Sequence, residues 1–222
     1  MNKINFTPKF ELILISVLTF FSFVLWDSFL IYPIKMLSVM IHETFHAFTT
    51  LLTGGKISSI NIDLNLGGKI ETEFGSSILI SLSGYFGSLF VGLLFFKLSQ
   101  NEKLFRFFIY SLSIMILIVL ANSNPNADYI FISLLIISFL IFIAVFINNN
   151  YFQFLIRFLG LVSMIYVLID LKNDLLNDFY VSDAKILSDI INVNSFLIAL
   201  VWIFVTFALI FVTVKNFYFR ND

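Results

Sequence analysis

The stretch Val39-Met40-Ile41-His42-Glu43-Thr44-Phe45-His46-Ala47-Phe48 places an H-E-x-x-H motif inside an apolar segment, and its two histidines are the only ones in the chain. Four residues apart on a helix, His42 and His46 project from one face, one turn apart. That geometry suits two nitrogen ligands of a tetrahedral zinc ion. Glu43 lies about 100° round the helix from His42, where its carboxylate can take a proton from zinc-activated water. The motif therefore predicts a hydrolytic zinc site.

The alternative is a structural or degenerate motif, because a buried histidine is most often a hydrogen-bonded core residue. Three ionisable groups within one apolar helical turn are costly in a membrane unless they have a use. That cost favours the metal site.

The composition is that of a polytopic membrane protein. Of 222 residues, 59% are apolar and only 12% are charged, and the mean hydropathy is +0.99. A soluble domain carries about 25% charged residues. We expect an integral membrane protein, with the lipid bilayer as its environment. The formal net charge of −1 indicates no nucleic-acid partner, and the absence of cysteine excludes disulfides and thiolate ligands.

Seven apolar runs are long enough to be candidate membrane helices. They cover approximately residues 10–31, 34–53, 76–98, 104–121, 129–147, 151–171 and 196–214. Asp27 and Pro33 interrupt the first part, so the first two runs could instead form one broken unit. The predicted fold is an all-α polytopic membrane protein with six to seven transmembrane helices in one domain. With seven spans the Lys and Arg residues divide evenly between the two faces, which leaves the orientation open.

Residues 56–74 differ in kind from the apolar runs. From Ile60 to Leu66, apolar residues alternate with Asn61, Asp63 and Asn65, which is the period of a strand. Gly67-Gly68 is suited to a two-residue hairpin turn. We predict a small β-hairpin between the second and third runs, whose unpaired edge could add a strand from an unwound substrate. A plain polar loop is the alternative.

A catalytic zinc site needs a third protein ligand, which must here be a carboxylate or another oxygen. Asp170 is the favoured candidate, because an aspartate in the last apolar turn of a spanning helix is costly unless it is paired or ligating. Asp183 follows Ser182 at a predicted helix start, and Asp128 lies in a turn, so both have structural explanations. Asp174 lies one turn beyond Asp170. We predict that Asp170 lies near both histidine rings, whereas Asp128 and Asp183 do not.

Small residues recur in the third run from Ser81 to Gly92. They allow close helix approach in lipid, either for packing alone or as a thin wall beside the histidine helix.

His42-Glu43-Thr44-Phe45-His46-Ala47, followed by Leu52-Thr53-Gly54-Gly55-Lys56, resembles the site-2 protease family of intramembrane zinc metallopeptidases, in particular its small bacterial branch. Ser83-Gly84-Tyr85-Phe86-Gly87-Ser88 is similar to the glycine motif of the next helix, and Ser182-Asp183-Ala184 and Trp202 are similar to features of the C-terminal part. The resemblance implies Zn²⁺ held by His42 and His46, with Glu43 as catalytic acid/base, in a protein of a bacterial cell membrane. Better-known members take the third ligand from an Asn-Pro-x-Asp-Gly segment, whereas Asn124-Pro125-Asn126-Ala127-Asp128 lacks the glycine.

The resulting hypothesis is that residues 1–222 form one membrane-embedded metallopeptidase domain. Its substrate would be a membrane protein, cleaved within or beside the bilayer. Two alternatives remain: a non-catalytic membrane receptor or scaffold that retains a zinc site, and a membrane zinc hydrolase of another amide or of lipid.

Overall fold

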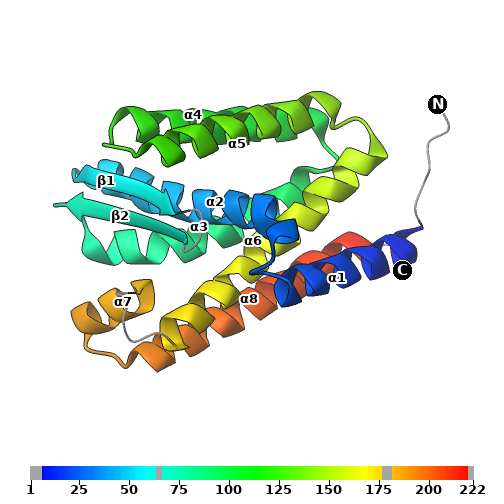
Figure 1. The fold of residues 1–222 in the computed structure, drawn as a ribbon. Coiled ribbons are helices and arrows are strands. Elements are labelled where there is room, and N and C mark those ends of the chain that lie inside the picture. Colours follow the sequence, from blue (N-terminus) through cyan, green and yellow to red (C-terminus); the bar gives the residue numbers. More distant parts are fainter. Residues whose placement is uncertain (1–6, 64–66, 177–181, 220–222) are drawn as a thin grey trace.

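The computed structural model describes residues 7–63, 67–176 and 182–219 (Figure 1). Its elements in chain order are α1 (Pro8–Val24), the 3-10 helix η1 (Phe29–Ile31), α2 (Tyr32–Leu52), β1 (Lys56–Asp63), β2 (Gly67–Glu73), α3 (Ser77–Leu98), α4 (Glu102–Ala121), α5 (Ala127–Phe146), α6 (Asn150–Leu176), α7 (Asp183–Ile191) and α8 (Ser195–Tyr218). The prediction of an all-α membrane protein with one small hairpin is confirmed.

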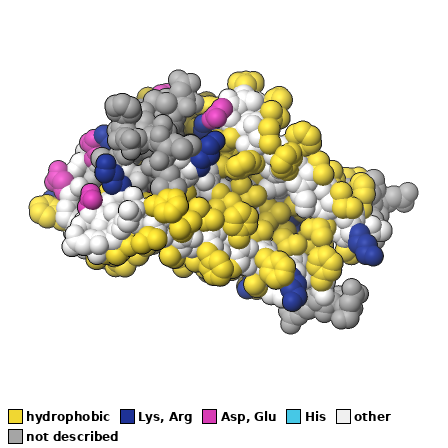
Figure 2. Space-filling model, turned by 90° about the horizontal axis from the view of Figure 1, so that it is seen from below, with side chains coloured by type: hydrophobic (Ala, Val, Ile, Leu, Met, Phe, Trp, Pro, Cys, Tyr) yellow, Lys and Arg dark blue, Asp and Glu magenta, His cyan; other side chains and the backbone are white. Residues whose placement is uncertain are grey.

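Among the described residues, five helices are long and apolar enough to cross a membrane: α3, α4, α5, α8 and the part of α6 up to Lys172. Their outer faces expose large apolar side chains such as Phe107 on α4, Phe131 on α5 and Phe204 on α8. Figure 2 shows apolar side chains covering the middle of one face of the molecule. Such a surface is suited to lipid rather than water.

The first apolar run does not continue to residue 31 as a single helix. α1 ends at Val24, η1 follows, and α2 begins with Pro33 in its first turn, where proline is tolerated. Asp27, at the break, forms an ion pair of 3.3 Å with Lys35. α1 and α2 run in the same direction and hardly touch each other (Figure 1). The broken-unit alternative therefore describes this part of the chain.

The helices form layers around α2, α3 and α6 (Figure 1). α4 and α5 pack together on one side, and α1 and α8 lie against α6 on the other. α3 and α6 cross where Gly92 and Gly160 meet, since a side chain at either position would collide with the other residue's backbone carbonyl. This close crossing brings α6 against the helix that lies beside α2.

The hairpin is antiparallel and pairs Ile60 with Ile70 and Asp63 with Gly67. The predicted turn at Gly67-Gly68 is wrong, because both glycines belong to β2 and residues 64–66, which lie outside the described part, join the strands. Ile60 and Ile62 are fully buried, as the alternation predicted. Gly54, just beyond the end of α2, has φ +80°, the left-handed conformation in which glycine commonly ends a helix.

Candidate metal centre

α2 carries His42, Glu43 and His46 in its middle, and all three are buried, with 3%, 8% and 6% of their surface exposed. One helical turn separates the histidines, so both rings point toward the same space between α2, α3 and α7. Their Nε2 atoms are 2.9 Å apart. The two rings therefore converge on one point.

α3 orients the ring of His46. Nδ1 of His46 lies 2.6 Å from the backbone carbonyl oxygen of Ile80 on α3. The hydroxyl of Ser83, on the same helix, is 3.3 Å from this nitrogen. A ring nitrogen that donates to a carbonyl carries the proton, which leaves Nε2 of a neutral imidazole with its lone pair. The backbone of α3 thus selects the tautomer in which Nε2 can bind a metal.

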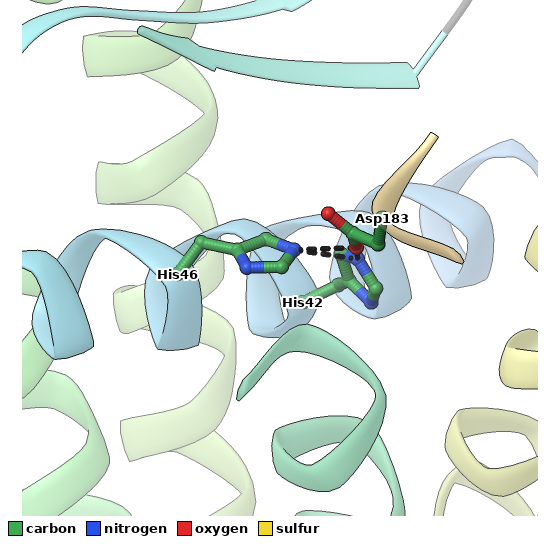
Figure 3. Close-up of side chains that lie close together, drawn as sticks. All are labelled: His42, His46 and Asp183. Atoms are coloured by element: carbon green, nitrogen blue, oxygen red, sulfur yellow. Dashed lines mark hydrogen bonds and ion pairs between the residues drawn. The ribbon is translucent and has the colours of Figure 1, made fainter. Parts of the chain in front are cut away.

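Asp183, in the first turn of α7, points its carboxylate at both rings (Figure 3). Its Oδ2 lies 3.1 Å from Nε2 of His42 and 2.8 Å from Nε2 of His46. The prediction that Asp183 stays away from the histidines is therefore wrong. The helix start was recognised correctly, since Ser182 caps α7 by accepting from the amide of Lys185, but the sequence could not show that this helix start lies over α2.

The two histidine rings favour the charged form of the Asp183 carboxyl group. Burial raises the pKa of this carboxyl, but the His46 and His42 rings lower it more, so the pKa lies well below its ordinary value. A deprotonated carboxylate is the form that binds a metal ion.

Asp170 lies at the edge of the same cluster. One carboxylate oxygen is 3.6 Å from Nε2 of His42, and the other accepts a hydrogen bond of 3.3 Å from the Tyr166 hydroxyl. Asp170 therefore approaches one histidine, not both as predicted. Asp128 is exposed in the first turn of α5, and the described residues show no contact between it and either histidine. Asp174 lies in α6, but its side chain is outside the described part.

His42, His46 and Asp183 form the group whose ligand atoms fit one metal ion. The three atoms make a nearly equilateral triangle with sides of 2.9, 3.1 and 2.8 Å. A point about 2.0–2.2 Å from all three corners exists just outside its plane, and these are the distances at which zinc binds nitrogen and carboxylate oxygen. Two imidazoles and one carboxylate are also the protein ligands of many catalytic zinc sites. The residues therefore fit a zinc ion.

Two glycines allow backbone to approach this centre. A side chain at Gly84 on α3 would collide with Nε2 of both histidines, and one at Gly68 on β2 would collide with the carboxyl group of Glu43. Gly84 belongs to the predicted thin wall. The Gly67-Gly68 pattern predicted only a turn at Gly68, because no local pattern shows which strand passes over α2.

Aromatic rings hold His42 from two sides. Tyr85 of α3 and Tyr166 of α6 each place a ring centroid 5.5 Å from that of His42, both edge to face. Tyr85 packs in turn on Trp202 of α8. Tyr166 is not among the residues predicted for the site, although its position four residues before Asp170 places both on one face of α6.

The family model described as Peptidase M50B-like matches residues 14–213. The chain belongs to the Peptidase M50B-like family. This confirms the resemblance to the site-2 protease family that was noted from the motifs. No curated protein and no solved structure gives a significant match to the chain. Membership of the Peptidase M50B-like family, together with five candidate membrane helices, supports a peptidase that is an integral membrane protein.

Proposed function

We propose that the protein is an intramembrane zinc metallopeptidase that hydrolyses peptide bonds within or beside the bilayer. The observation that carries the proposal is the triangle formed by two Nε2 atoms and one carboxylate oxygen, with Glu43 on the same helical turn as the histidines. His42, His46 and Asp183 would hold the zinc ion. Zinc in such a set acts as a Lewis acid and brings the pKa of water down to about 7.

Glu43 would act as general base and then as general acid. It lies between the two histidines in sequence and is buried beneath β2, so bulk water is kept from its carboxyl group. In the proposed reaction Glu43 takes a proton from the attacking water and transfers it to the leaving amine. Proton transfer of this kind contributes about 10²–10⁴-fold to the rate.

Asp170 is not a zinc ligand in this proposal. Its nearer oxygen faces Nε2 of His42, the nitrogen that would bind zinc, and its other oxygen accepts from Tyr166, so we assign Asp170 to an outer carboxylate beside the ion and not to closing the ligand set. Outer-shell partners of this kind typically change metal affinity by about 10–100-fold.

The hairpin would hold the substrate extended. On one side of β1, Ile60 forms a bridge with Pro125, and Asn124 donates to the carbonyl of Ser58. Within the described residues no strand pairs with the outer edge of β2, and β2 is the strand that passes over Glu43. We therefore propose that an unwound substrate adds to β2, where its scissile bond would lie near Glu43.

The deciding experiment compares wild type with Glu43→Gln in proteoliposomes that contain a model single-span substrate. Zinc content should stay at about one ion per chain, while cleavage falls by about 10²–10⁴-fold. Glu73→Gln is the matched control, since Glu73 is an exposed glutamate at the end of β2 and lies outside the centre.

Three results would contradict the proposal. Wild-type protein without divalent metal, after purification free of chelators, would make the motif structural. Full activity in cells with Glu43→Gln would favour the receptor or scaffold alternative. Cleavage of a lipid or small amide, with none of the peptide substrate, would favour the other hydrolase.

A further inference from the structure

A groove runs along α6, between α1 and α8. Both of these helices pack on α6 but hardly touch each other, and the space between them has a volume of about 710 Å³. Binding sites for small molecules have volumes of about 300–1,000 Å³. The groove is therefore large enough to hold a ligand.

The lining of the groove is predominantly apolar. Phenylalanine rings of α1 and α8 form its two walls, and aliphatic side chains of α6 form its floor: Phe20, Phe23, Phe207, Phe211, Leu161 and Ile165. The four rings are 42–66% exposed, and α8 is the least buried of the five candidate membrane helices. An apolar ligand that enters the groove from the bilayer can therefore cover these rings.

Two lysines border one end of the groove. Lys215, in the last turn of α8, lines it, and its ammonium group lies 5.9 Å from the ring centroid of Phe211. Lys9 precedes the groove residue Leu12 by three positions on α1, so the two side chains lie on the same face of that helix. Both lysines are exposed.

No ion pair in the described part of the chain neutralises these lysines. Glu11, two residues after Lys9, is buried and accepts from Arg157 and Tyr218 instead. Figure 2 shows the molecule from the side of α1 and α8, and the dark blue side chains at the end where the termini lie in Figure 1 have no magenta neighbours. This end of the groove is therefore positively charged.

The length of the groove matches one leaflet of a membrane. From Leu12 to Phe23 it follows α1 for about 16 Å, at 1.5 Å per residue. The hydrocarbon core of a bilayer is about 30 Å thick, so one leaflet contributes about half of that. Lysines near helix ends extend their ammonium groups to the membrane surface, and basic pockets between membrane helices bind anionic headgroups.

We propose that the groove binds an anionic phospholipid of the surrounding bilayer. One acyl chain lies between α1 and α8, and the phosphate group lies between Lys9 and Lys215. A second copy of the chain complements the groove less well, because a two-fold axis normal to the membrane brings the lysines of both copies to the same depth. A phospholipid instead supplies a negative charge at that depth.

Native mass spectrometry of the full chain in detergent measures the binding. The anionic probe is dioleoyl phosphatidylglycerol, and the comparison is dioleoyl phosphatidylcholine, which has the same acyl chains and a zwitterionic headgroup. We expect a single phosphatidylglycerol molecule per chain, bound more tightly than phosphatidylcholine. Glycerol phosphate, which has no acyl chain, should not bind.

Lys9→Gln and Lys215→Gln should each weaken phosphatidylglycerol binding about fivefold, which corresponds to about 1 kcal/mol for each charge near lipid headgroups. Lys103→Gln is the matched control, since Lys103 is an exposed lysine at the start of α4 and does not line the groove. Ser16→Trp keeps both lysines but fills the groove from α1, so it should abolish the binding. Circular dichroism checks that this variant is folded.

Equal binding of the two phospholipids, or unchanged phosphatidylglycerol binding in both lysine variants, would overturn the recognition of the phosphate group. Unchanged binding by Ser16→Trp would place the lipid outside the groove. A dimer that Ser16→Trp dissociates, or a single-span peptide that displaces the lipid from wild type and does not bind Ser16→Trp, would assign the groove to a protein instead. None of these measurements depends on cleavage, so their result stands apart from that of the Glu43→Gln experiment.

Discussion

Asp183 is the residue on which the proposed zinc site depends most. It is the carboxylate that reaches both histidines, and its charge is already stabilised by their rings. An amide in its place keeps the shape but loses the negative charge that a metal ion prefers.

We expect Asp183→Asn to lower zinc affinity by more than the about 10–100-fold typical of outer-shell changes, and Asp170→Asn to remain within that range. Zinc titration of purified apoprotein measures both. Asp189→Asn is the control, because Asp189 is an exposed aspartate on the same helix. A larger loss in Asp170→Asn than in Asp183→Asn would return the role of third ligand to Asp170.

Gly68 shows how one missing side chain permits the contact between the hairpin and Glu43. Gly68→Ala puts a methyl group where the Glu43 carboxyl lies, so either β2 or Glu43 must move. Misplacement of a catalytic group by about 1 Å can cost about 10²-fold in rate. We expect a loss of that order in turnover, with zinc retained. Lys69→Ala, at the exposed neighbouring position, should keep its activity; equal loss in both variants would point to a general weakening of the hairpin.

At the scale of elements, α3 sets the space available to the metal centre. Gly84 faces the two histidine nitrogens and Gly87, one turn later, faces the ring of Phe45. Both glycines let α3 approach α2, but only Gly84 touches the ligand atoms.

We therefore expect Gly84→Ala to lose zinc, and Gly87→Ala to lose thermal stability while it keeps zinc at low temperature. Metal analysis and thermal unfolding in detergent, carried out on both variants, separate the two effects. Equal zinc loss in the two variants would mean that helix spacing alone controls the site.

The hairpin is the element that the proposed mechanism uses for substrate binding. Ile62→Pro removes a backbone donor from β1 and should reduce cleavage while zinc stays bound, because the metal residues lie on α2 and α7. Proline at Asp63 should act in the same direction. Ile62→Ala is the matched control: it loses buried packing, worth about 2–5 kcal/mol, but keeps the donor. Unchanged cleavage of a helical substrate by Ile62→Pro would remove the hairpin from the mechanism.

At the scale of the whole molecule, the buried pair Glu11–Arg157 joins α1, the first helix, to α6. Glu11 also accepts from Tyr218, and the Arg157 guanidinium lies 5.1 Å from the ring of Phe217. Removing one partner of a buried ion pair leaves the other charge uncompensated, which costs about 3–5 kcal/mol.

Glu11→Gln and Arg157→Met should therefore each lower the thermal unfolding temperature, without a direct effect on zinc at the other end of the molecule. The double variant Glu11→Leu/Arg157→Leu should recover part of the loss, since no charge is then left unpaired. A double variant less stable than either single variant would show that the pair is not coupled in this way.

The sequence by itself determined the class of the protein and half of its centre. Apolar runs long enough to span a bilayer, a strand-period segment and two histidines one turn apart are local patterns, and each follows from the periodicity of a helix or a strand. Where the helices start and end was also largely determined by local sequence, as the cap at Ser182 and the left-handed Gly54 show.

Only the tertiary structure decided which carboxylate meets the histidines, because that depends on where α7 lies after the chain has crossed the bundle along α6. Asp170 and Asp183 are both plausible by burial and charge. The packing of α7 against α3 and α8 then carries Asp183 onto both rings and leaves Asp170 beside one.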